Sequence, residues 1–459
     1  MALIKSISGI RGTIGGKPGN NLTPLDIVKF ASAYGTWLIN NNNGNEIKVV
    51  LGRDARISGA IVQDLVLASL QALGIDVVDL GLSTTPTVEL AVTMEHAQGG
   101  VILTASHNPK QWNALKLLNE KGEFISAADG QDILDLADQE AFSYAEVDHL
   151  GSVESKDYLE KHIQAVLDLD LVNADLVKNA GFKVVIDAVN STGGIYIPAL
   201  LRALGVEVHE LYCEPNGQFP HNPEPLPEHL GDLCDKVLDT KSHLGFVVDP
   251  DVDRLAIVSE DGTLFGEEYT LVAVADFILQ NVKGNTVSNL SSTRALRDVT
   301  EKYGGTYYAS AVGEVNVVDT MKEVSAVIGG EGNGGIIYPD SHFGRDALVG
   351  VALFLTSLAK FGGTCSALRK EFKNYYMSKQ KIQLTPELDV DAILSEMAKK
   401  YASEDVNTID GVKINFTEEW VHLRKSNTEP IIRVYTESVS SEKANALAQR
   451  FIQEISEIA

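Results

Sequence analysis

The sequence is short of positive charge and of long apolar runs. Lys and Arg total 38 against 63 Asp and Glu, so the formal net charge is −25. Nucleic acids and anionic membranes recruit surfaces rich in Lys and Arg, so this balance argues against both as partners. No apolar run reaches the roughly 20 residues that span a bilayer. Residues 1–12 lack the apolar segment of a secretory signal, and residues 348–359 are expected to form a buried helix.

Cysteine is also scarce. Cys213, Cys234 and Cys365 lie far apart, so they fit neither a zinc site nor a disulfide framework. Their odd number is typical of a reducing compartment, and we expect a cytoplasmic protein. Hydrophobic residues make up 44% of the chain and charged residues 22%, which excludes disorder for most of it. The length, 459 residues, corresponds to about three domains.

A strand–helix–strand pattern recurs along the chain. Residues 47–51 and 75–80 are expected strands that flank a helical pattern, and residues 182–208 repeat the arrangement. The sequence at 70–77, LQALGIDV, matches LRALGVEV at 201–208. A weaker third copy runs through residues 286–308. Strands that alternate with helices predict mostly parallel sheets covered on both faces.

The C-terminal part has a different pattern. Residues 411–416 and 431–435 are strand-like with a polar turn between them, and residues 441–458 form an amphipathic helical pattern. The sequence therefore predicts three α/β domains with mixed or parallel sheets, followed by an α+β domain. The expected boundaries give domains of residues 1–150, 151–255, 256–370 and 371–459, with a first linker within residues 137–156.

The first polar cluster, residues 104–109, follows the apolar strand 100–103. In open α/β sheets, ligands bind where the strands end at their carboxyl edges. Ser106 is therefore a candidate nucleophile or phosphate carrier. The alternative is an N-cap serine that precedes a helix containing Leu115 and Leu117.

The second cluster contains Asp249, Asp251 and Asp253 between two apolar strands. Carboxylates at alternating positions can converge on one hard divalent cation. An EF-hand is excluded because its sixth position is Arg254 rather than Gly and because the flanks are strand-like. A solvated acidic turn remains the alternative.

The third cluster is the glycine-rich segment 329–335. It satisfies the dinucleotide fingerprint G-x-G-x-x-G, but a strand-like segment ending in Pro339 follows instead of the required helix. We therefore interpret the match as accidental. Glu331 and Asn333 could bind sugar hydroxyls, and the alternative is a tight turn between strands.

The fourth cluster offers a guanidinium, hydroxyls, an amide and loop N–H groups, which suit a phosphate ion. The alternative is an ordinary surface turn. Its members are Arg424, Ser426, Asn427 and Thr428, with Arg433 shortly after.

Together these motifs resemble the α-D-phosphohexomutases. The matching segments are Ser-His-Asn-Pro, Asp-x-Asp-x-Asp-Arg, Gly-Glu-Gly-Asn-Gly and Arg-x-Ser-Asn-Thr-Glu-Pro, with residues 8–12 and 52–54 as further family-like segments. The resemblance covers nearly the whole chain. It implies four domains, three of them related, around a central cleft.

The resemblance implies that the enzyme interconverts hexose 1-phosphates and 6-phosphates. Ser106 would carry a phosphoryl group and pass it to the substrate, and the bound hexose 1,6-bisphosphate would then return its other phosphate. Hexose 1,6-bisphosphate would also be the activator. Mg²⁺ would be held by Asp249, Asp251, Asp253 and a phosphoserine oxygen.

The resemblance assigns further roles. Arg254 and Arg11 would lie at the reacting phosphate, and Lys116 or His107 would serve as general acid and base. Glu331 and Asn333 would hold sugar hydroxyls. Closure of the last domain would exclude water. The phosphate that does not react would be anchored by Arg424, Ser426, Asn427 and Thr428, with Arg433 nearby.

Three positions depart from the family pattern. Gly335 stands where many members have His, Ala114 stands where Gly usually precedes the loop lysine, and Asn333 stands where several have Ser. The pattern leans towards phosphoglucosamine mutase, with phosphomannomutase and phosphoglucomutase as alternatives. A phosphatase and a non-catalytic sugar-phosphate binder are less favoured. Either a monomer or a homodimer is compatible with the sequence.

The negative net charge does not exclude an anionic substrate. Net charge is a surface average, whereas a few basic side chains can create a local positive field in one cleft. The expected contributors are Arg11, Lys116, Arg254, Arg424 and Arg433.

Overall fold

The structure is a computed structural model that describes residues 3–6, 9–42, 46–383, 389–425 and 431–458. The chain forms two compact units. Unit 1 comprises residues 1–277 and 333–369, and unit 2 comprises residues 278–332 and 370–459. Within the described ranges, no helix combines the length and apolar character needed to cross a membrane.

Unit 1 begins with a seven-stranded mixed sheet of order β1-β2-β6-β5-β3-β4-β7. The adjoining pairs among β3, β4, β5 and β7 are parallel, whereas β6 is antiparallel to β5 and to β2. The predicted choice of a mixed or parallel sheet is thus confirmed as a mixed sheet here. The strands are β1 (Leu3–Ser6), β2 (Gly9–Thr13), β3 (Lys48–Arg53), β4 (Asp76–Leu82), β5 (Gly99–Leu103), β6 (Trp112–Leu118) and β7 (Val153–Ser155).

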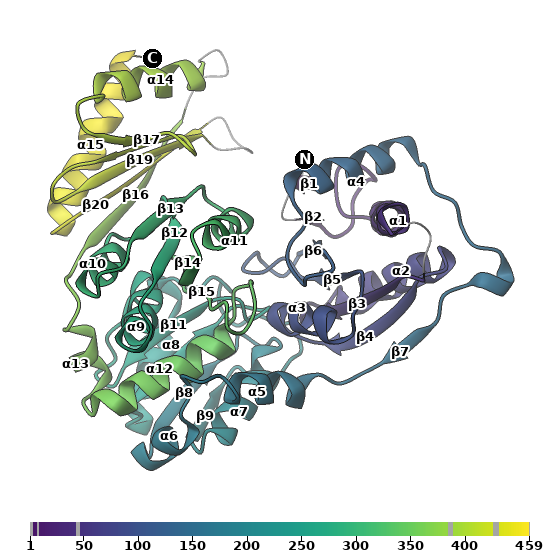
Figure 1. Cartoon of the computed structure of the whole chain (residues 1–459), viewed down its shortest axis with the longest axis horizontal. Helices are drawn as coiled ribbons and strands as arrows, with labels where there is room; N and C mark the ends of the chain where they lie inside the picture. Colours follow the sequence, from purple (N-terminus) through teal and green to yellow (C-terminus); the bar gives the residue numbers. More distant parts are fainter. Residues whose placement is uncertain (1–2, 7–8, 43–45, 384–388, 426–430, 459) are drawn as a thin grey trace. The chain divides into compact units, whose positions relative to one another are not determined.

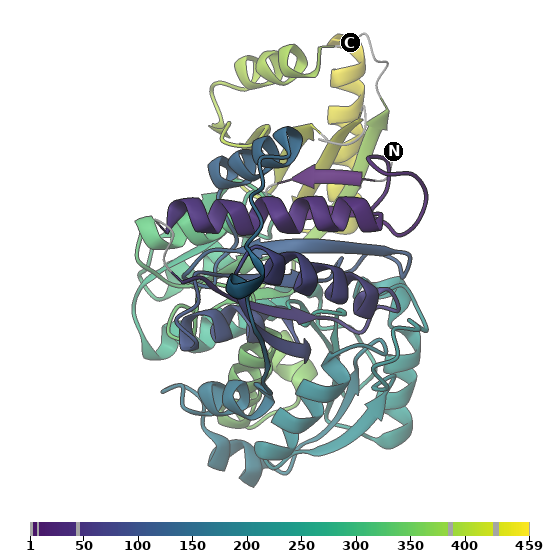
Figure 2. The same cartoon turned by 90° about the vertical axis from the view of Figure 1, so that its right-hand side faces the viewer.

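Helices cover both faces of this sheet because its strands are apolar on both sides (Figure 1). Val49 and Leu51 of β3 pack in the core cluster that includes residues of α1 and α2, while Val50 packs with residues of α3. Figure 2 shows α1 along its length, in purple. The helices are α1 (Pro24–Asn41), α2 (Gly59–Ala72), α3 (Thr85–Met94) and α4 (Ala127–Gln139).

The segment with Leu115 and Leu117 is a strand, β6, so the alternative of a helix after Ser106 was wrong. Leu115 and Leu117 both belong to the core cluster with α1. Because side chains alternate across a strand, Lys116 between them projects to the opposite face. The alternation of side chains along a strand, rather than helical spacing, explains why Leu115 and Leu117 share one face of β6.

The second sheet of unit 1 has the order β11-β10-β8-β9. Its strands are parallel except for β10 and β11, which form an antiparallel hairpin. The expected strands at 182–186 and 244–248 are confirmed as β8 and β10. The elements are β8 (Lys183–Asp187), β9 (Glu207–Leu211), β10 (Leu244–Val248), β11 (Leu255–Ser259), α5 (Leu159–Leu167), α6 (Ala174–Ala180), α7 (Gly193–Ala203) and α8 (Gly231–Thr240), with short 3-10 turns η1 (Val147–His149) and η2 (Pro227–His229).

The expected buried helix at 348–359 is confirmed as α12 (Ala347–Phe361), whose residues are buried from Ala347 to Leu358. Asp346 begins this helix because its carboxylate accepts hydrogen bonds from the N–H groups of Leu348 and Val349. Unit 1 also contains β15 (Gly335–Ile337), α13 (Cys365–Arg369) and most of α9 (Glu267–Asn281).

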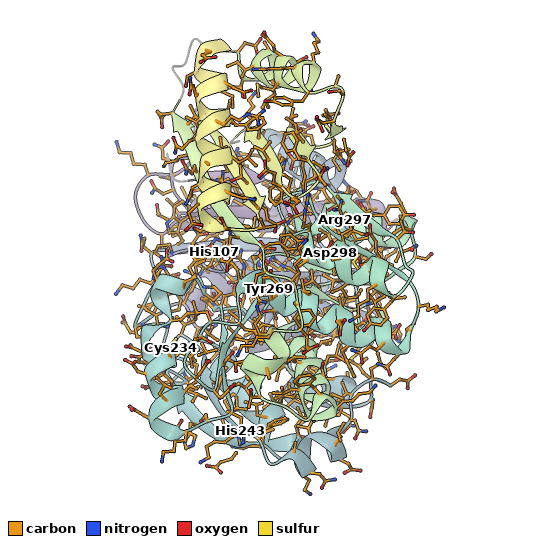
Figure 3. The ribbon with its side chains drawn as sticks, turned by 90° about the vertical axis from the view of Figure 1, so that its left-hand side faces the viewer. His107, Cys234, His243, Tyr269, Arg297 and Asp298 are labelled. Carbon is orange, nitrogen blue, oxygen red and sulfur yellow. The ribbon has the colours of Figure 1, made fainter. Side chains whose placement is uncertain are left out.

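Unit 2 combines a parallel three-strand segment with an antiparallel sheet. The parallel strands, in the order β13-β12-β14, match the expected third repeat. Two of its α10 residues, Arg297 and Asp298, are labelled in Figure 3. The elements are β12 (Asn285–Asn289), α10 (Ala295–Lys302), β13 (Tyr307–Ser310), α11 (Glu314–Glu323) and β14 (Ala326–Glu331).

The C-terminal sheet is antiparallel throughout, in the order β16-β20-β19-β18-β17. The amphipathic helix expected at 441–458 is confirmed as α15. The segment between the two expected strands contains a further strand, β19, rather than only a polar turn. The elements are β16 (Tyr376–Gln383), α14 (Val390–Lys400), β17 (Asp405–Asn407), β18 (Val412–Asn415), β19 (Trp420–Lys425), β20 (Ile431–Ser438) and α15 (Ser441–Ile458).

Candidate active site

Ser106 lies in the loop after β5, at the carboxyl edge of the first sheet, and is 3% exposed. Its hydroxyl donates a hydrogen bond of 2.7 Å to Oδ2 of Asp249, 143 residues away in sequence. The backbone of Ser106 has φ +47°, a left-handed conformation that costs a non-glycine residue on the order of 1–3 kcal/mol. The fold thus holds a strained serine against a buried carboxylate.

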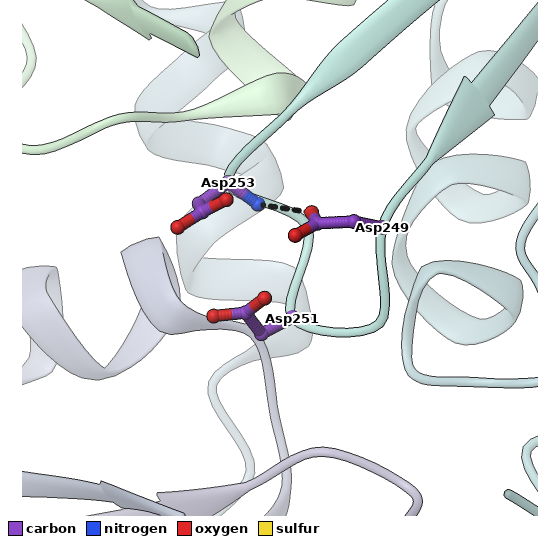
Figure 4. A group of neighbouring side chains, drawn as sticks. All are labelled: Asp249, Asp251 and Asp253. Atoms are coloured by element: carbon purple, nitrogen blue, oxygen red, sulfur yellow. Dashed lines mark hydrogen bonds between the residues drawn. The ribbon is translucent and has the colours of Figure 1, made fainter. Parts of the chain in front are cut away.

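The three aspartates occupy the turn of the β10–β11 hairpin and are fully buried (Figure 4). One oxygen from each lies within 4.8 Å of those of the other two. Oδ1 of Asp249 accepts hydrogen bonds of 3.2 Å from the N–H groups of Asp253 and Arg254, which shape the turn. The alternative of a solvated acidic turn is wrong because no carboxylate here reaches solvent.

The donor set fits a hard divalent cation. Burial, with the neighbouring Asp253 and Asp251 carboxylates, raises the pKa of Asp249 well above its ordinary value. Oδ1 of Asp251 is buried, and the described part of the chain supplies it with no hydrogen bond. Three crowded carboxylate oxygens are the ligands that Mg²⁺ and Ca²⁺ prefer, and a cation would relieve both their repulsion and the unpaired oxygen.

Two buried cations flank the carboxylates. Nζ of Lys116 donates a 2.7 Å hydrogen bond to Oδ2 of Asp251 and lies 3.5 Å from Oδ2 of Asp253. Although burial opposes the charge, the Asp251 and Asp253 carboxylates raise the pKa of Lys116. Arg345 donates from Nη2 to Oδ2 of Asp253 over 2.6 Å. No motif in the sequence marks Arg345 as a member of this site.

His107 follows Ser106 in the chain and has Arg11 and Arg254 nearby. Nδ1 of His107 lies 3.4 Å from the Ser106 hydroxyl oxygen, and burial, with Arg254 and Arg11 nearby, lowers the pKa of His107 to about 2. Arg11 donates a 2.8 Å hydrogen bond to Asn108. His107 is therefore a neutral imidazole beside the serine at pH 7.

Arg254 lies between two carboxylates. Its Nη1 is 3.5 Å from Oε1 of Glu224, and its Nε is 3.8 Å from Oδ1 of Asp253. Glu224 also lies 3.9 Å from Nε2 of His107. The structure thus adds Glu224 to this group. Glu224 lies in an irregular loop, where no sequence pattern would have predicted its role.

The remaining predicted residues belong to other elements. Asn333, in unit 1, accepts a hydrogen bond from the N–H of Gly335. In unit 2, Glu331 ends β14 and accepts from Asn289 over 2.8 Å, while Arg424 on β19 faces Arg433 on β20 across the strand pair. Nε of Arg424 pairs with Asp410 at 2.8 Å. Ser426, Asn427 and Thr428 lie outside the described residues.

Comparison with known proteins identifies the family. Models of the phosphoglucomutase/phosphomannomutase family match four successive segments: α/β/α domain I over residues 3–144, domain II over 156–262, domain III over 266–375 and the C-terminal domain over 381–454. The chain belongs to the α-D-phosphohexomutase family. The predicted resemblance and the fold of three α/β domains and one C-terminal domain are confirmed, and the protein is an enzyme of the mutase type.

Relatives of this family match over nearly the whole chain. The phosphoglucomutase/phosphomannomutase of Thermococcus kodakarensis is 34% identical, covering 94% of this chain and 95% of its own. A probable phosphoglucosamine mutase of Methanopyrus kandleri is 33% identical, covering 97% and 96%. The crystal structure of a phosphoglucomutase/phosphomannomutase family protein from Burkholderia thailandensis has a TM-score of 0.85 and 27% identity, covering 98% of this chain and 96% of its own.

Proposed function

We propose that this phosphohexomutase carries its phosphoryl group on Ser106 and moves it between the 1- and 6-positions of a hexose phosphate through a bound 1,6-bisphosphate. The observation that carries the proposal is the 2.7 Å hydrogen bond between the Ser106 hydroxyl and Asp249, inside a buried cluster of three carboxylates. A serine in this position can form and break a bond to phosphorus beside a cation site.

Phosphoryl transfer needs alignment and charge neutralisation more than covalent assistance. A Mg²⁺ ion held by Asp249, Asp251 and Asp253 would supply Lewis-acid neutralisation of the transferring group. Arg11 and Arg254 would bind its remaining oxygens. As the O–P bond at Ser106 breaks, a sugar hydroxyl bonds to phosphorus and loses its proton to a base in the cluster.

Two side chains are candidates for that proton transfer. Neutral His107, with Nδ1 3.4 Å from the Ser106 oxygen, can accept the proton as it stands. Lys116 is a cation held by two of the aspartates, so it can accept the proton only after donating its own. The second half-reaction reverses the roles, because the same group must return the proton when Ser106 is phosphorylated again. Variants of each residue separate the two assignments.

Glu331 and Asn333 would bind the sugar hydroxyls, and Arg424, Ser426, Asn427, Thr428 and Arg433 would anchor the phosphate that does not react. A guanidinium pair such as Arg424 and Arg433, adjacent across two strands, offers two forks of N–H donors to a phosphate. Closure of the C-terminal domain over the substrate would exclude water, which otherwise hydrolyses the phosphoserine.

Glucosamine phosphate is the leading candidate substrate, with mannose and glucose phosphates as alternatives. The similarity to a probable phosphoglucosamine mutase supports the first, and a nearly equal similarity to a phosphoglucomutase/phosphomannomutase supports the others. Discrimination between an amine and a hydroxyl rests on a few placed atoms, so each sugar must be assayed.

One assay tests the proposal. The protein is incubated with Mg²⁺, a trace of the matching hexose 1,6-bisphosphate and each candidate 1-phosphate, and the products are separated. A mutase forms the 6-phosphate, a phosphatase releases inorganic phosphate, and a binding protein does neither. The peptide containing Ser106 should gain the mass of a phosphoryl group. Full turnover by the Ser106→Ala variant would contradict the proposal.

A further inference from the structure

Arg56 is an arginine that the proposed reaction does not use, yet it is buried beside the serine loop. It is 1% exposed, and it is among the largest fully buried side chains of the described chain. The Phe219 ring lies 5.2 Å from the guanidinium carbon and covers it. A buried charge of this kind is retained only where its donors are satisfied.

The guanidinium spends all five of its N–H donors on this region. Nε donates to Oδ2 of Asp54 over 2.9 Å. Nη1 donates to the carbonyls of Pro109 and Trp112 at 2.8 and 3.0 Å, and Nη2 donates to the carbonyls of Asn108, at 2.7 Å, and of Ser106. Four carbonyl groups of residues 106–112 therefore converge on one side chain.

Asp54 also fixes the backbone N–H of Ser106, through Thr104. The Ser106 N–H donates to the hydroxyl oxygen of Thr104 over 2.9 Å, and the Thr104 hydroxyl donates to Oδ2 of Asp54 over 2.7 Å. Asp54 is thus shared by Arg56 and Thr104. The amide and the carbonyl of Ser106 are both fixed by groups that meet at this carboxylate.

We propose that Arg56 is a positioning residue that holds Ser106 in its left-handed conformation, so that the hydroxyl is aimed at Asp249 and is ready to exchange a phosphoryl group. This rests on the proposed function. A non-glycine residue leaves φ +47° readily unless the surrounding contacts oppose it. Lysine cannot make the same hydrogen bonds to Asp54 and the four carbonyls, because an ammonium has three donors on a flexible stem rather than the planar fork of a guanidinium.

A matched control exists in unit 2. Arg294 is also buried, at 6% exposed, and also binds a turn through carbonyls, those of Thr417, Phe416 and Glu419 at 3.0 to 3.1 Å. That turn has no place in the proposed reaction. Arg56→Lys and Arg294→Lys therefore each remove a buried guanidinium that binds several backbone carbonyls. In the first variant the affected loop carries the reacting serine, and in the second it does not.

The test measures the rate at which a hexose 1,6-bisphosphate, tried as the glucosamine, mannose and glucose compounds, phosphorylates Ser106 in a single turnover, by the mass of the Ser106 peptide. Arg56→Lys should slow this rate by about 100-fold, the effect of a misplacement of about 1 Å, and leave KM for the hexose 1-phosphate within about threefold. Arg294→Lys should stay within about threefold of the wild type when compared per folded molecule. Guanidinium ion should partly restore Arg56→Ala.

Equal rates in the wild type and Arg56→Lys would overturn the proposal, and so would equal losses in both lysine variants. Hydrogen exchange of residues 105–112 gives a readout that needs no activity: exchange should rise in Arg56→Lys, and unchanged protection would overturn the positioning role. If the wild type is never phosphorylated, the proposed function fails, and the positioning role fails with it even if the exchange rises.

Discussion

The two units bury carboxylates in opposite ways. In unit 1, Asp249, Asp251 and Asp253 crowd together, and burial with mutual repulsion raises the pKa of Asp249. In unit 2, burial also raises the pKa of Glu437, but the charged neighbour that acts on it is the cation Lys413, which lowers the pKa. Oε1 of Glu437 accepts from the Trp420 indole N–H at 2.7 Å and from the Arg294 backbone N–H at 3.0 Å. The repulsion in the first arrangement calls for a cation, whereas the second already contains donors for its carboxylate.

The difference distinguishes a site from a scaffold. Three crowded carboxylates that repel one another even with Lys116 and Arg345 beside them indicate a bound cation, whereas a single buried carboxylate that accepts hydrogen bonds does not. The comparison therefore supports assigning chemistry to the β10–β11 turn and a structural role to Glu437. Four experiments challenge or sharpen this contrast, from the largest expected effect to the smallest.

Asp249→Asn should separate activity from stability. The amide oxygen can still accept from the N–H groups of Asp253 and Arg254, while an NH2 group takes the place of the oxygen that accepts from the Ser106 hydroxyl. The change also removes a carboxylate metal ligand, so mutase turnover should fall by at least about 100-fold. Without metal, the free energy of unfolding should stay equal or rise, because one member of the repelling group is neutral. Turnover and urea unfolding in EDTA measure the two effects. A clear loss of stability in EDTA would refute the assigned repulsion.

Glu437→Ala should lower the stability of the fold and leave the chemistry at Ser106 unchanged. Two buried donors, the Trp420 indole N–H and the Arg294 amide, would lose their acceptor, which costs about 2–4 kcal/mol of unfolding free energy. The phosphorylation rate of Ser106, per folded molecule, should be unchanged. Urea unfolding and the single-turnover assay provide the measurements, and a stable but inactive variant would contradict the structural role.

Magnesium itself should stabilise the wild type. Binding to the folded state alone adds about 2.7 kcal/mol at a concentration of 100 times Kd. The melting temperature should therefore rise with Mg²⁺ in the wild type and not in Asp251→Asn, which lacks one ligand. Calorimetry of both proteins with and without Mg²⁺ checks this. An equal rise in both would place the cation elsewhere.

Acid should destabilise unit 2 through His422. Burial lowers the pKa of this imidazole to about 4, below the value of about 6.5 expected in the unfolded chain. The unfolded state thus binds the proton more readily, so stability is full above pH 6.5 and is lost as the pH falls towards 4. The loss should reach about 2 kcal/mol at pH 5.

His422→Asn provides the comparison for this pH effect. The amide can still interact with the Ser291 hydroxyl that contacts Nδ1 of His422 at 2.9 Å, but it does not titrate. The difference in unfolding free energy between the two proteins should therefore shrink between pH 8 and pH 5. Parallel stability profiles would show that His422 titrates normally.

The sequence predicted the members of the site that follow apolar strands. Ser106 comes after β5 and the three aspartates come after β10, and strand ends are recognisable because hydrophobic runs stop there. The three α/β repeats and α15 were found for the same reason. These features are local, and a local pattern is visible in a single chain.

What escaped prediction depends on distant partners. Arg56 binds carbonyls about 50 residues away, and Arg345 binds Asp253 92 residues away. Every residue has a backbone carbonyl, so the sequence does not show which carbonyls a given arginine will bind. A serine before Leu115 and Leu117 is also compatible with an N-capped helix, and only the pairing of β6 with β5 and β2 fixes this segment as a strand.

The left-handed backbone of Ser106 has a practical consequence. Glycine would occupy φ +47° without penalty, so Ser106→Gly combines loss of the hydroxyl with relief of backbone strain. Most inactivating substitutions weaken a protein, whereas here the relief of backbone strain should offset the lost hydrogen bond to Asp249 and leave a folded, chemically silent scaffold. Such a scaffold suits soaking with intact bisphosphates, because it has no hydroxyl to exchange with them.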